Sequence, residues 1–350
     1  YLPVAGRLRQ LPRSLEENAR VLGQRPHQIL SRVVLPQISS VITAGTLLVF
    51  LYTISDFGAV QLMRYDTLAR SIYTSQLGNQ SVALALSLIL LVLAGIIVTT
   101  ERFFSRINFT TNETLVGEPT QYSLGKWRLP ALGFVIFTVL LSIGAPLLAL
   151  GNWATDGLIR TTRGGSPLTI DADQVWESTW NTFSISVIAG LVTVAAILPI
   201  AYLTARYKSR VGNIAHSVVI ATFALPGILI ALAMRFWTLQ SDWAYDLVNN
   251  TKVLLVFSYA VRFGSLAIGV VLLAVSFVPK RLHDAGKILG AKRVSRLLRI
   301  DLPIMAPGLG AAAGLVILST MKELPITLLI SPLGFSTLST RIFSSFEEAF

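Results

Sequence analysis

Long apolar runs separated by short polar segments dominate this chain. Each run is long enough to cross the roughly 30 Å hydrocarbon layer of a bilayer as a helix. The runs are residues 38–57, 82–99, 129–150, 183–203, 214–237, 253–278 and 306–330. Seven such runs predict an all-α integral membrane protein built as a polytopic helical bundle.

One polar segment occurs twice between these runs. Residues 15–36 and 282–303 align at a constant offset of 267 positions, with seven identities among 22. Such self-similarity indicates an internal repeat, and we call the two copies the first and second repeat loops. A basic amphipathic turn lying on the membrane surface is the alternative reading, but it does not explain why the same turn recurs between apolar runs. The repeat predicts two pseudo-symmetric halves, an arrangement that commonly holds a solute path at the repeat interface.

The repeat also sets the expected domain boundaries. We expect a first half at 1–106 with two spanning helices, a linker at 107–128, and a second half at 129–350 with five spanning helices. Seven spans end the chain on the side opposite the loops, and the first repeat loop lies close to Tyr1. We therefore expect the sequence to be a fragment that lacks amino-terminal spans and a last span after Phe350.

Composition supports the membrane class, and the distribution of charge orients the helices. The chain is 53% hydrophobic and 13% charged, with a mean hydropathy of +0.65, far from a soluble domain with about a quarter of its residues charged. Of the 29 Lys and Arg residues, 20 lie in the segments on the side of the repeat loops and six on the other side. This asymmetry is the positive-inside pattern, so we expect both repeat loops on the cytoplasmic side.

The chain offers little catalytic chemistry. It has no cysteine and only three scattered histidines, His27, His216 and His283. No phosphate-binding loop, paired carboxylates or nucleophile motif has the required spacing. We therefore expect no catalytic residue, no metal site and no cofactor, and we expect any ATP hydrolysis to occur on a separate chain.

Four charged residues within or beside the spans are candidates for a solute pathway. A lone charge at the bilayer centre costs about 2.5–3.5 kcal/mol on insertion scales, so each needs a reason. Arg262 is closest to mid-depth, where it either lines a path or forms an ion pair. Lys322 and Glu323 should approach the outer end of their span, with Asp56 at the equivalent place in the first half. These three either form an outer gate or extend to the membrane interface.

The repeat loops resemble a known motif. Residues 16–36, which begin Glu-Glu-Asn-Ala-x3-Gly, and 284–303, which begin Asp-Ala-Gly-x3-Gly, are similar to the EAA loop of binding-protein-dependent ABC importer permeases. Residues 181–206 and 224–227 also resemble that family. The segments Ser-Asp-Phe-Gly-Ala at 55–59 and Lys-Glu-Leu-Pro-Ile-Thr-Leu-Leu at 322–329 look like its fused, two-domain iron(III) subfamily. The loops depart from the usual pattern where Asn18 and Gly286 replace alanines.

The resemblance implies a function and partners. The chain would be the permease of an ATP-driven importer in the bacterial inner membrane, a multi-pass transport subunit without enzymatic activity of its own. Each loop would dock on one of two copies of a cytoplasmic ATP-binding subunit, while an external solute-binding protein delivers the solute. Membrane lipid surrounds the helices, and no nucleic acid is involved. The residues implied in coupling to the ATPase are Glu17, Ala19, Leu22, Gly23, Pro36, Asp284, Ala285, Leu289, Gly290 and Pro303.

Other readings stay open at this point. Relatives of the iron(III) subfamily carry thiamine or phosphonate compounds. An ion-coupled secondary transporter would need carboxylates at mid-depth, whereas Asp56 and Glu323 are expected near the outer ends. A membrane-embedded enzyme would need a nucleophile, a metal cluster or an acid–base pair, and the sequence shows none of these.

Overall fold

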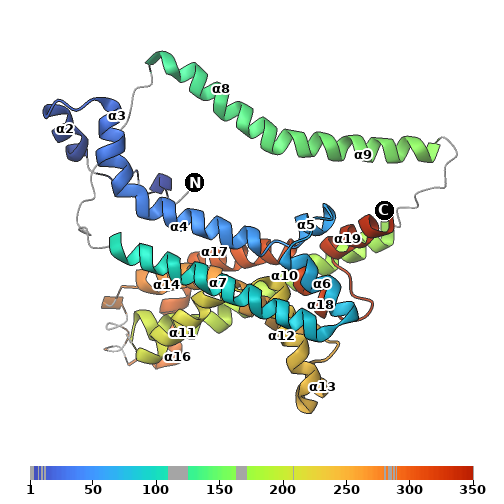
Figure 1. Cartoon of the computed structure of the whole chain (residues 1–350). Coiled ribbons are helices and arrows are strands. Elements are labelled where there is room, and N and C mark those ends of the chain that lie inside the picture. The colour runs from blue at the N-terminus through green and yellow to red at the C-terminus, as the bar shows by residue number, and fades with distance from the viewer. Residues whose placement is uncertain are drawn as a thin grey trace. The chain divides into compact units, whose positions relative to one another are not determined.

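The computed structural model describes residues 4–6, 8, 11, 13–108, 125–162, 172–207, 209–279, 281–282, 286, 288 and 290–349 (Figure 1). These residues form helices and connecting segments, and none of them lies in a strand. The chain divides into two compact units, residues 1–42 with 110–173 and residues 43–109 with 174–350. The all-α membrane fold expected from the sequence is confirmed. Most of the expected linker, 109–124, lies outside the described residues.

The first unit contains the first repeat loop and one long apolar helix. Its elements are α2 (Arg13–Val21), α3 (Pro26–Ile29), the π-helical η1 (Leu30–Val34), the start of α4 (Leu35–Ile54), η2 (Gly125–Trp127), α8 (Arg128–Val139), η3 (Leu140–Gly144) and α9 (Ala145–Thr162). A small apolar cluster joins the repeat loop to the start of α4, formed by Leu11, Ala19, Ile29, Val34 and Ile38.

The second unit contains the main core. After the end of α4 it comprises α5 (Gly58–Leu62), α6 (Leu68–Gly78), α7 (Gln80–Asn108), α10 (Ala172–Ala205), α11 (Arg210–Ala221), η4 (Thr222–Ala224), α12 (Gly227–Gln240), α13 (Asp242–Val248), α14 (Lys252–Phe277), α16 (Arg293–Arg296), the π-helical η5 (Leu297–Asp301), α17 (Leu302–Met321), α18 (Pro325–Ile330) and α19 (Leu338–Ala349).

Fewer unbroken helices could cross a membrane than the seven apolar runs suggested. In the described part of the chain, five helices are long and apolar enough, and a bent pair over Pro26–Ile54 would make a sixth. The run 214–237 is not one helix, because α11 ends at Ala221 and α12 begins at Gly227. Leu225 is extended, with φ −80° and ψ 123°, as expected before a proline, whose ring disfavours helical geometry in the preceding residue.

Small residues let the long helices of the second unit approach closely. α14 packs along α17 (Figure 1), and a Cβ built on Gly308 of α17 would stand 2.6 Å from the Cβ of Ala274. A Cβ on Gly190 of α10 would stand 2.7 Å from Ile317. Close backbone approach at glycine is a usual way for helices to associate in membranes, where the hydrophobic effect between helices is absent.

The internal repeat is visible in the backbone. At the offset of 267, η1 corresponds to η5 and α4 to α17. In each pair the two elements begin and end at equivalent positions. Gly23 and Gly290 both have left-handed geometry, with φ of +76° and +74°. The π turns are also repeated, which a sequence periodicity of 3.6 residues could not show. The similarity therefore extends from sequence to local geometry.

Candidate functional site

A buried ion pair lies where two helix breaks meet in the second unit. Arg262 Nε of α14 is 3.4 Å from Glu323 Oε2, and the exposed fractions of the two side chains are 16% and 8%. Arg262 Nη1 also donates to the carbonyl of Leu225, in the break between α11 and α12, at 3.4 Å. A charge buried at membrane depth is expensive unless it is paired, and this geometry supplies the partner. Of the two roles that the sequence left open for Arg262, the ion pair is present.

The break before α18 places Glu323. α17 ends at Met321, and the chain turns through residues 322–324 before Pro325 starts the next helix. Proline fits at the first position of a helix because the N–H that it lacks would have no partner within the helix. Glu323 Oε1 accepts a long hydrogen bond of 3.5 Å from the N–H of Ile326. Its carboxyl group therefore caps α18 and contacts Arg262 at once. A carboxylate is favoured at a helix amino terminus.

Glycine at the start of α12 makes room for the pair. A Cβ built on Gly227 would stand 2.5 Å from Arg262 Nη1 and 2.6 Å from Glu323 Oε1. Real Cβ atoms do not approach other heavy atoms so closely. The Leu-Pro-Gly sequence thus does two things here: it breaks the span, and it lets the charged groups reach the backbone.

Two residues beside the pair were not identified from the sequence. The Tyr259 hydroxyl is 2.6 Å from the Thr327 hydroxyl, and Thr327 donates to the carbonyl of Glu323 at 2.8 Å. Because a threonine hydroxyl has one hydrogen, Tyr259 must be the donor. Tyr259 lies three residues before Arg262, on the same helical face, and this spacing was the available signal.

The other pathway candidates are not part of this pair. Asp56 follows α4 as Glu323 follows α17, and the preceding turns match: Asp56 N–H donates to Thr53 and Glu323 N–H to Thr320. Among the described residues, however, no cation pairs with Asp56. Lys322, next to Glu323 in the chain, is exposed and is not in the pair. The described contacts therefore do not bring Asp56 or Lys322 into the Arg262–Glu323 pair.

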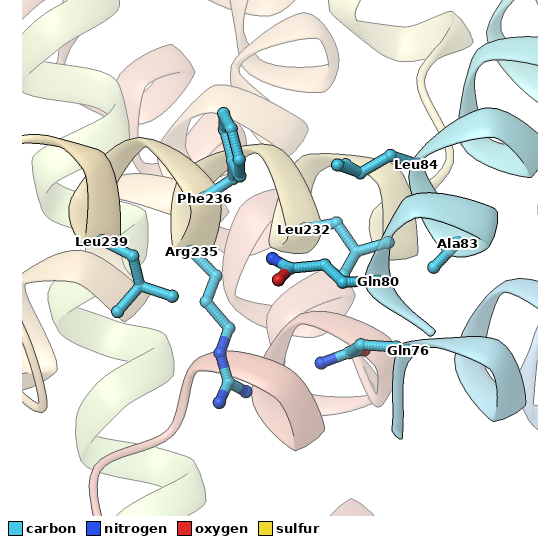
Figure 2. Close-up of a pocket in the computed structure, with 8 residues that line it drawn as sticks. All are labelled: Gln76, Gln80, Ala83, Leu84, Leu232, Arg235, Phe236 and Leu239. Carbon is cyan, nitrogen blue, oxygen red and sulfur yellow. The ribbon is translucent and has the colours of Figure 1, made fainter. Parts of the chain in front are cut away.

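The opposite end of α18 contacts a second arginine. Arg235 Nη1 of α12 donates to the Leu329 carbonyl at 3.2 Å, so α18 has an arginine at each end. Beside Arg235, a pocket of about 140 Å³ opens between α12 and the α6–α7 corner. Figure 2 shows its polar side chains, Gln76, Gln80 and Arg235, directed toward the same space from these helices.

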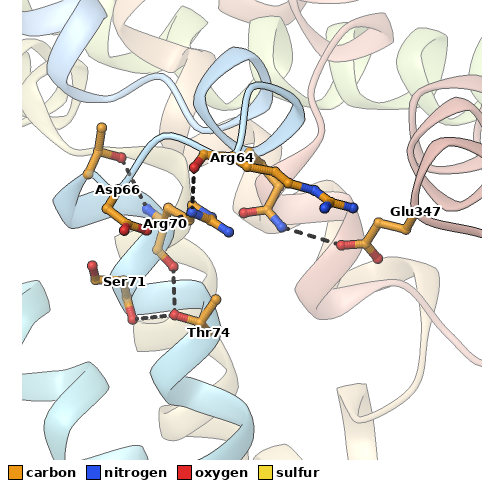
Figure 3. Close-up of polar contacts among 8 residues, drawn as sticks. Arg64, Asp66, Arg70, Ser71, Thr74 and Glu347 are labelled. Carbon is orange, nitrogen blue, oxygen red and sulfur yellow. Dashed lines mark hydrogen bonds and ion pairs between the residues drawn. The ribbon is translucent and has the colours of Figure 1, made fainter. Parts of the chain in front are cut away.

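The α5–α6 corner is braced by a network of polar contacts (Figure 3). Arg70 donates to Asp66 at 2.6 Å and to the Arg64 carbonyl at 2.8 Å. The N–H of Arg70 also donates to Thr67, which caps α6. Gln61 donates to Glu347 of α19 at 3.3 Å, so the network ties the corner to the last helix.

Related segments of the two repeats meet beside this network. Tyr73 and Phe343, equivalent at an offset of 270, have ring centroids 6.4 Å apart in an edge-to-face arrangement. Phe57, only 1% exposed, lies 5.0 Å from Tyr73 and 6.1 Å from Phe343 between centroids. Burial and the nearby Glu347 carboxylate raise the pKa of Tyr73. Residues 67–73, Thr-Leu-Ala-Arg-Ser-Ile-Tyr, are similar to residues 337–343, Thr-Leu-Ser-Thr-Arg-Ile-Phe, and the two segments are in direct contact through these rings.

The first repeat loop presents a different apolar surface from the expected one. Ala19 is buried in the local cluster, with 6% of its surface exposed, and Leu22 is 79% exposed in the turn after α2. Val21, which the sequence reading did not select, is 87% exposed. Glu17 and Pro36 are exposed, and Gly23 occupies the left-handed turn. Ala19 therefore anchors the loop, while Val21 and Leu22 are available to a partner.

The second repeat loop shows the same division where it is described. Asp284, Ala285 and Leu289 lie outside the described residues. Ile288, the equivalent of Val21, is 86% exposed, and Gly290 takes the left-handed turn.

Pro303 is the second residue of α17.

Gly286, which stands where the usual loop pattern has alanine, has a packing reason to lack a side chain. A Cβ there would stand 2.9 Å from Ile300 and 3.1 Å from the buried Arg296. In the first copy Ile29 is equivalent to Arg296 and Ala19 is equivalent to Gly286, and there the alanine fits within the same apolar cluster as the isoleucine.

The second repeat loop is held at both of its ends by the last turns of α10 and the residue that follows this helix. Arg206 donates to the carbonyl of Val278, just before the loop, at 2.8 Å. Tyr202 donates to the Asp301 carboxyl, at the end of the loop, at 2.7 Å. Asp301 is 1% exposed. Tyr202 and Arg206 belong to the segment 181–206, which resembles the permease family in sequence, and the structure shows what these two polar residues contact.

The other end of α10 contacts the segment before α19. Asn181 donates to the Ser336 carbonyl at 3.2 Å, and the Leu338 N–H donates to Thr182 at 2.8 Å. One helix of 34 residues thus connects the repeat loop with the opposite end of the unit. In the described part of the chain, no three His, Cys, Asp or Glu side chains are grouped to hold a metal ion.

Comparisons with known proteins identify a family and relatives of this chain. Residues 2–106 and 197–350 match the family described as binding-protein-dependent transport system inner membrane component. The chain is 30% identical to the Fe(3+)-transport system permease protein FbpB 2 of Haemophilus influenzae, over 100% of this chain and 68% of that protein. It is also 27% identical to a putative ABC transporter permease protein of Streptomyces antibioticus, over 43% of this chain and 65% of that protein.

Proposed function

The chain belongs to the family of binding-protein-dependent transport system inner membrane components, as a permease of the ABC importer class, and we propose that it carries iron(III) into the cell. The family confirms the resemblance of the repeat loops and the multi-pass membrane character. The iron substrate, the partner subunits and the inner-membrane location are parts of the proposal. Iron(III) is supported by the similarity to the Haemophilus influenzae protein over the whole of this chain.

The observation that carries the mechanism is the exposed apolar pair at equivalent positions of the two loops. Val21 and Ile288 each expose nearly nine-tenths of their surface, at 87% and 86%, just before left-handed glycines. Exposed apolar side chains rimmed by polar residues mark interaction sites. Each loop would insert this side chain into a groove of one cytoplasmic ATP-binding subunit, so that one chain contacts two copies.

Movement of the second loop would reach the membrane through α10. Arg206 and Tyr202 hold the chain immediately before and at the end of this loop. Closure of an ATPase dimer would draw the loops together, and α10 would transmit the displacement to its other end at Asn181 and Thr182. That end would lie toward the external solute-binding protein, where it contacts the segment before α19.

The buried Arg262–Glu323 pair would act as a gate on the solute path. It joins α14 to two helix breaks, and breaks are where backbone can move without disrupting a complete span. Lys322 and Asp56 would contribute charge near the same level without forming the pair. Movement of α12 or α18 would separate the charges and open the path beside Gly227.

The ATPase contact can be tested with paired variants. The double variant Val21→Glu and Ile288→Glu should abolish co-purification of the ATP-binding subunit encoded with this permease, because acidic side chains cannot enter an apolar groove without large desolvation costs. The control is Leu333→Glu, which makes the same change at a residue that is 90% exposed. Leu333 lies in the segment after α18, where its N–H donates to Asn250 just before α14. Equal co-purification of the double variant and the wild type would contradict the docking role.

The substrate is tested by uptake in a strain that lacks the transporter. Labelled iron(III) should accumulate when the permease is restored, and labelled thiamine should not. Replacement of Gly23 and Gly290 by leucine should stop uptake, since both have a positive φ that L side chains rarely adopt. Iron uptake that is independent of the permease would overturn the substrate assignment.

A further inference from the structure

We propose that the pocket formed by Gln76, Gln80 and Arg235 binds a small oxyanion that enters with the transported solute. The proposal rests on the importer function, and it assigns a binding role to three residues outside the ion pair. The pocket lies at the end of α14 away from the second repeat loop. Arg235 contacts the end of α18 there, and Asn250, just before α14, accepts a hydrogen bond from the N–H of Leu333.

Hydrogen-bond donors converge on this pocket. In Figure 2 the side chain of Arg235 extends from α12 past the pocket, and the amide nitrogen of Gln76 points toward its guanidinium. Arg235 uses Nη1 on the Leu329 carbonyl, and a guanidinium has five N–H donors. Among the described residues no carboxylate pairs with Arg235. Arg235 is exposed at this pocket, and an anionic acceptor placed between these donors would bond to both.

The Gln76 amide is unsatisfied in the same place. Its Oε1 is buried without a hydrogen-bond partner in the described part of the chain. An amide oxygen accepts hydrogen bonds, so the protonated oxygen of a hydrogen phosphate or a water bound to the anion would satisfy it. The unsatisfied oxygen is therefore an observation independent of Arg235 that points to a ligand carrying a hydroxyl group or a bound water.

Backbone polarity adds to the positive potential. Gln80 is the first residue of α7, a helix of 29 residues, and the amino terminus of a helix carries about half a positive charge. Helix amino termini bind anions through this dipole and their free N–H groups. Arg235 and the start of α7 thus act in the same direction.

The lining excludes a bare metal cation. Beyond the three polar residues it consists of Ala83, Leu84, Leu232, Phe236 and Leu239, which supply no carboxylate or imidazole. An iron(III) ion would meet a guanidinium and would be repelled. The volume of about 140 Å³ equals that of four or five waters at roughly 30 Å³ each. This size suits one phosphate or the carboxylate edge of an iron chelate.

The test uses the purified permease with its ATP-binding subunits in lipid nanodiscs. Binding of radiolabelled inorganic phosphate and of ferric citrate is measured for the wild type, Arg235→Gln and Gln76→Leu. Arg64→Gln is the control, because it removes the same charge from an exposed residue away from the pocket. We expect at least tenfold weaker binding for Arg235→Gln, a smaller loss for Gln76→Leu, and no change for the control.

The two probes distinguish the source of the oxyanion. Saturable binding of phosphate alone assigns the pocket to a free anion, while binding of ferric citrate alone assigns it to the anionic shell of an iron complex. If neither probe binds, or if Arg235→Gln and Arg64→Gln bind alike, the proposal is wrong. ATPase co-purification and iron uptake are measured on the same samples. If they persist while neither probe binds, the pocket proposal fails and the importer function stands.

Discussion

Gly227 lies directly against the Arg262 guanidinium, and a Cβ at this position would stand 2.5 Å from Nη1. The absence of a side chain at Gly227, the first residue of α12, is therefore part of the geometry of the Arg262–Glu323 pair. This relationship connects a helix break with a buried charge, and it makes the pair sensitive to a substitution on a helix that contributes no charged group to it.

Replacement of Gly227 by valine should displace the Arg262 side chain and lower both stability and uptake. Overpacking of a filled site typically costs about 1–3 kcal/mol. Thermal unfolding followed by tryptophan fluorescence measures the stability, and labelled iron uptake measures the transport. Gly269→Ala in α14 is the control, because nothing lies within 4 Å of its added Cβ. A Gly227→Val protein as stable and active as this control would show that the close approach is unimportant.

Removal of one partner of the ion pair should be worse than removal of both. Arg262→Met or Glu323→Leu alone leaves a buried charge unpaired, which costs about 3–5 kcal/mol, whereas apolar replacement of both partners is often neutral. A double-mutant cycle on thermal stability measures the coupling. If the double variant is stable but does not transport, the pair acts in gating. Additive losses in stability would mean that the two charges do not interact.

Loss of the Tyr202 hydroxyl should uncouple the second repeat loop from α10. Tyr202→Phe keeps the ring and removes the 2.7 Å hydrogen bond to Asp301, an interaction worth about 1–3 kcal/mol. We expect ATPase co-purification to persist while uptake per ATP hydrolysed falls. Tyr207→Phe, at a residue 69% exposed, should change neither quantity. A parallel fall in ATPase binding and uptake would instead indicate that Tyr202 only maintains the loop fold.

Truncation of Phe57 should destabilise the contact between the equivalent segments. Phe57→Ala removes a ring that is 1% exposed and lies against Tyr73 and Phe343, and such substitutions cost about 3–5 kcal/mol. Tyr65→Ala, at a residue 70% exposed, provides the comparison. Thermal unfolding of both variants gives the difference. Equal melting temperatures would show that the aromatic contact contributes little.

The sequence by itself determined the membrane class and the repeat. Apolar runs of spanning length need helices, because a bilayer cannot satisfy backbone hydrogen bonds in another way. The offset of 267 also aligns Gly23 with Gly290, and both take the left-handed turn that glycine adopts without a steric penalty. These features follow from neighbouring residues, so they can be read along the chain.

Only the tertiary structure decided which charges meet. Asp56 and Glu323 occupy equivalent positions with the same preceding turn, but in the part of the chain that the structure describes, Glu323 pairs with an arginine and Asp56 does not. The α11–α12 break brings Gly227 to that pair, and α10 brings Tyr202 to Asp301, 99 residues away. Such contacts depend on how distant helices pack together. Neither hydrophobic periodicity nor the repeat carries that information.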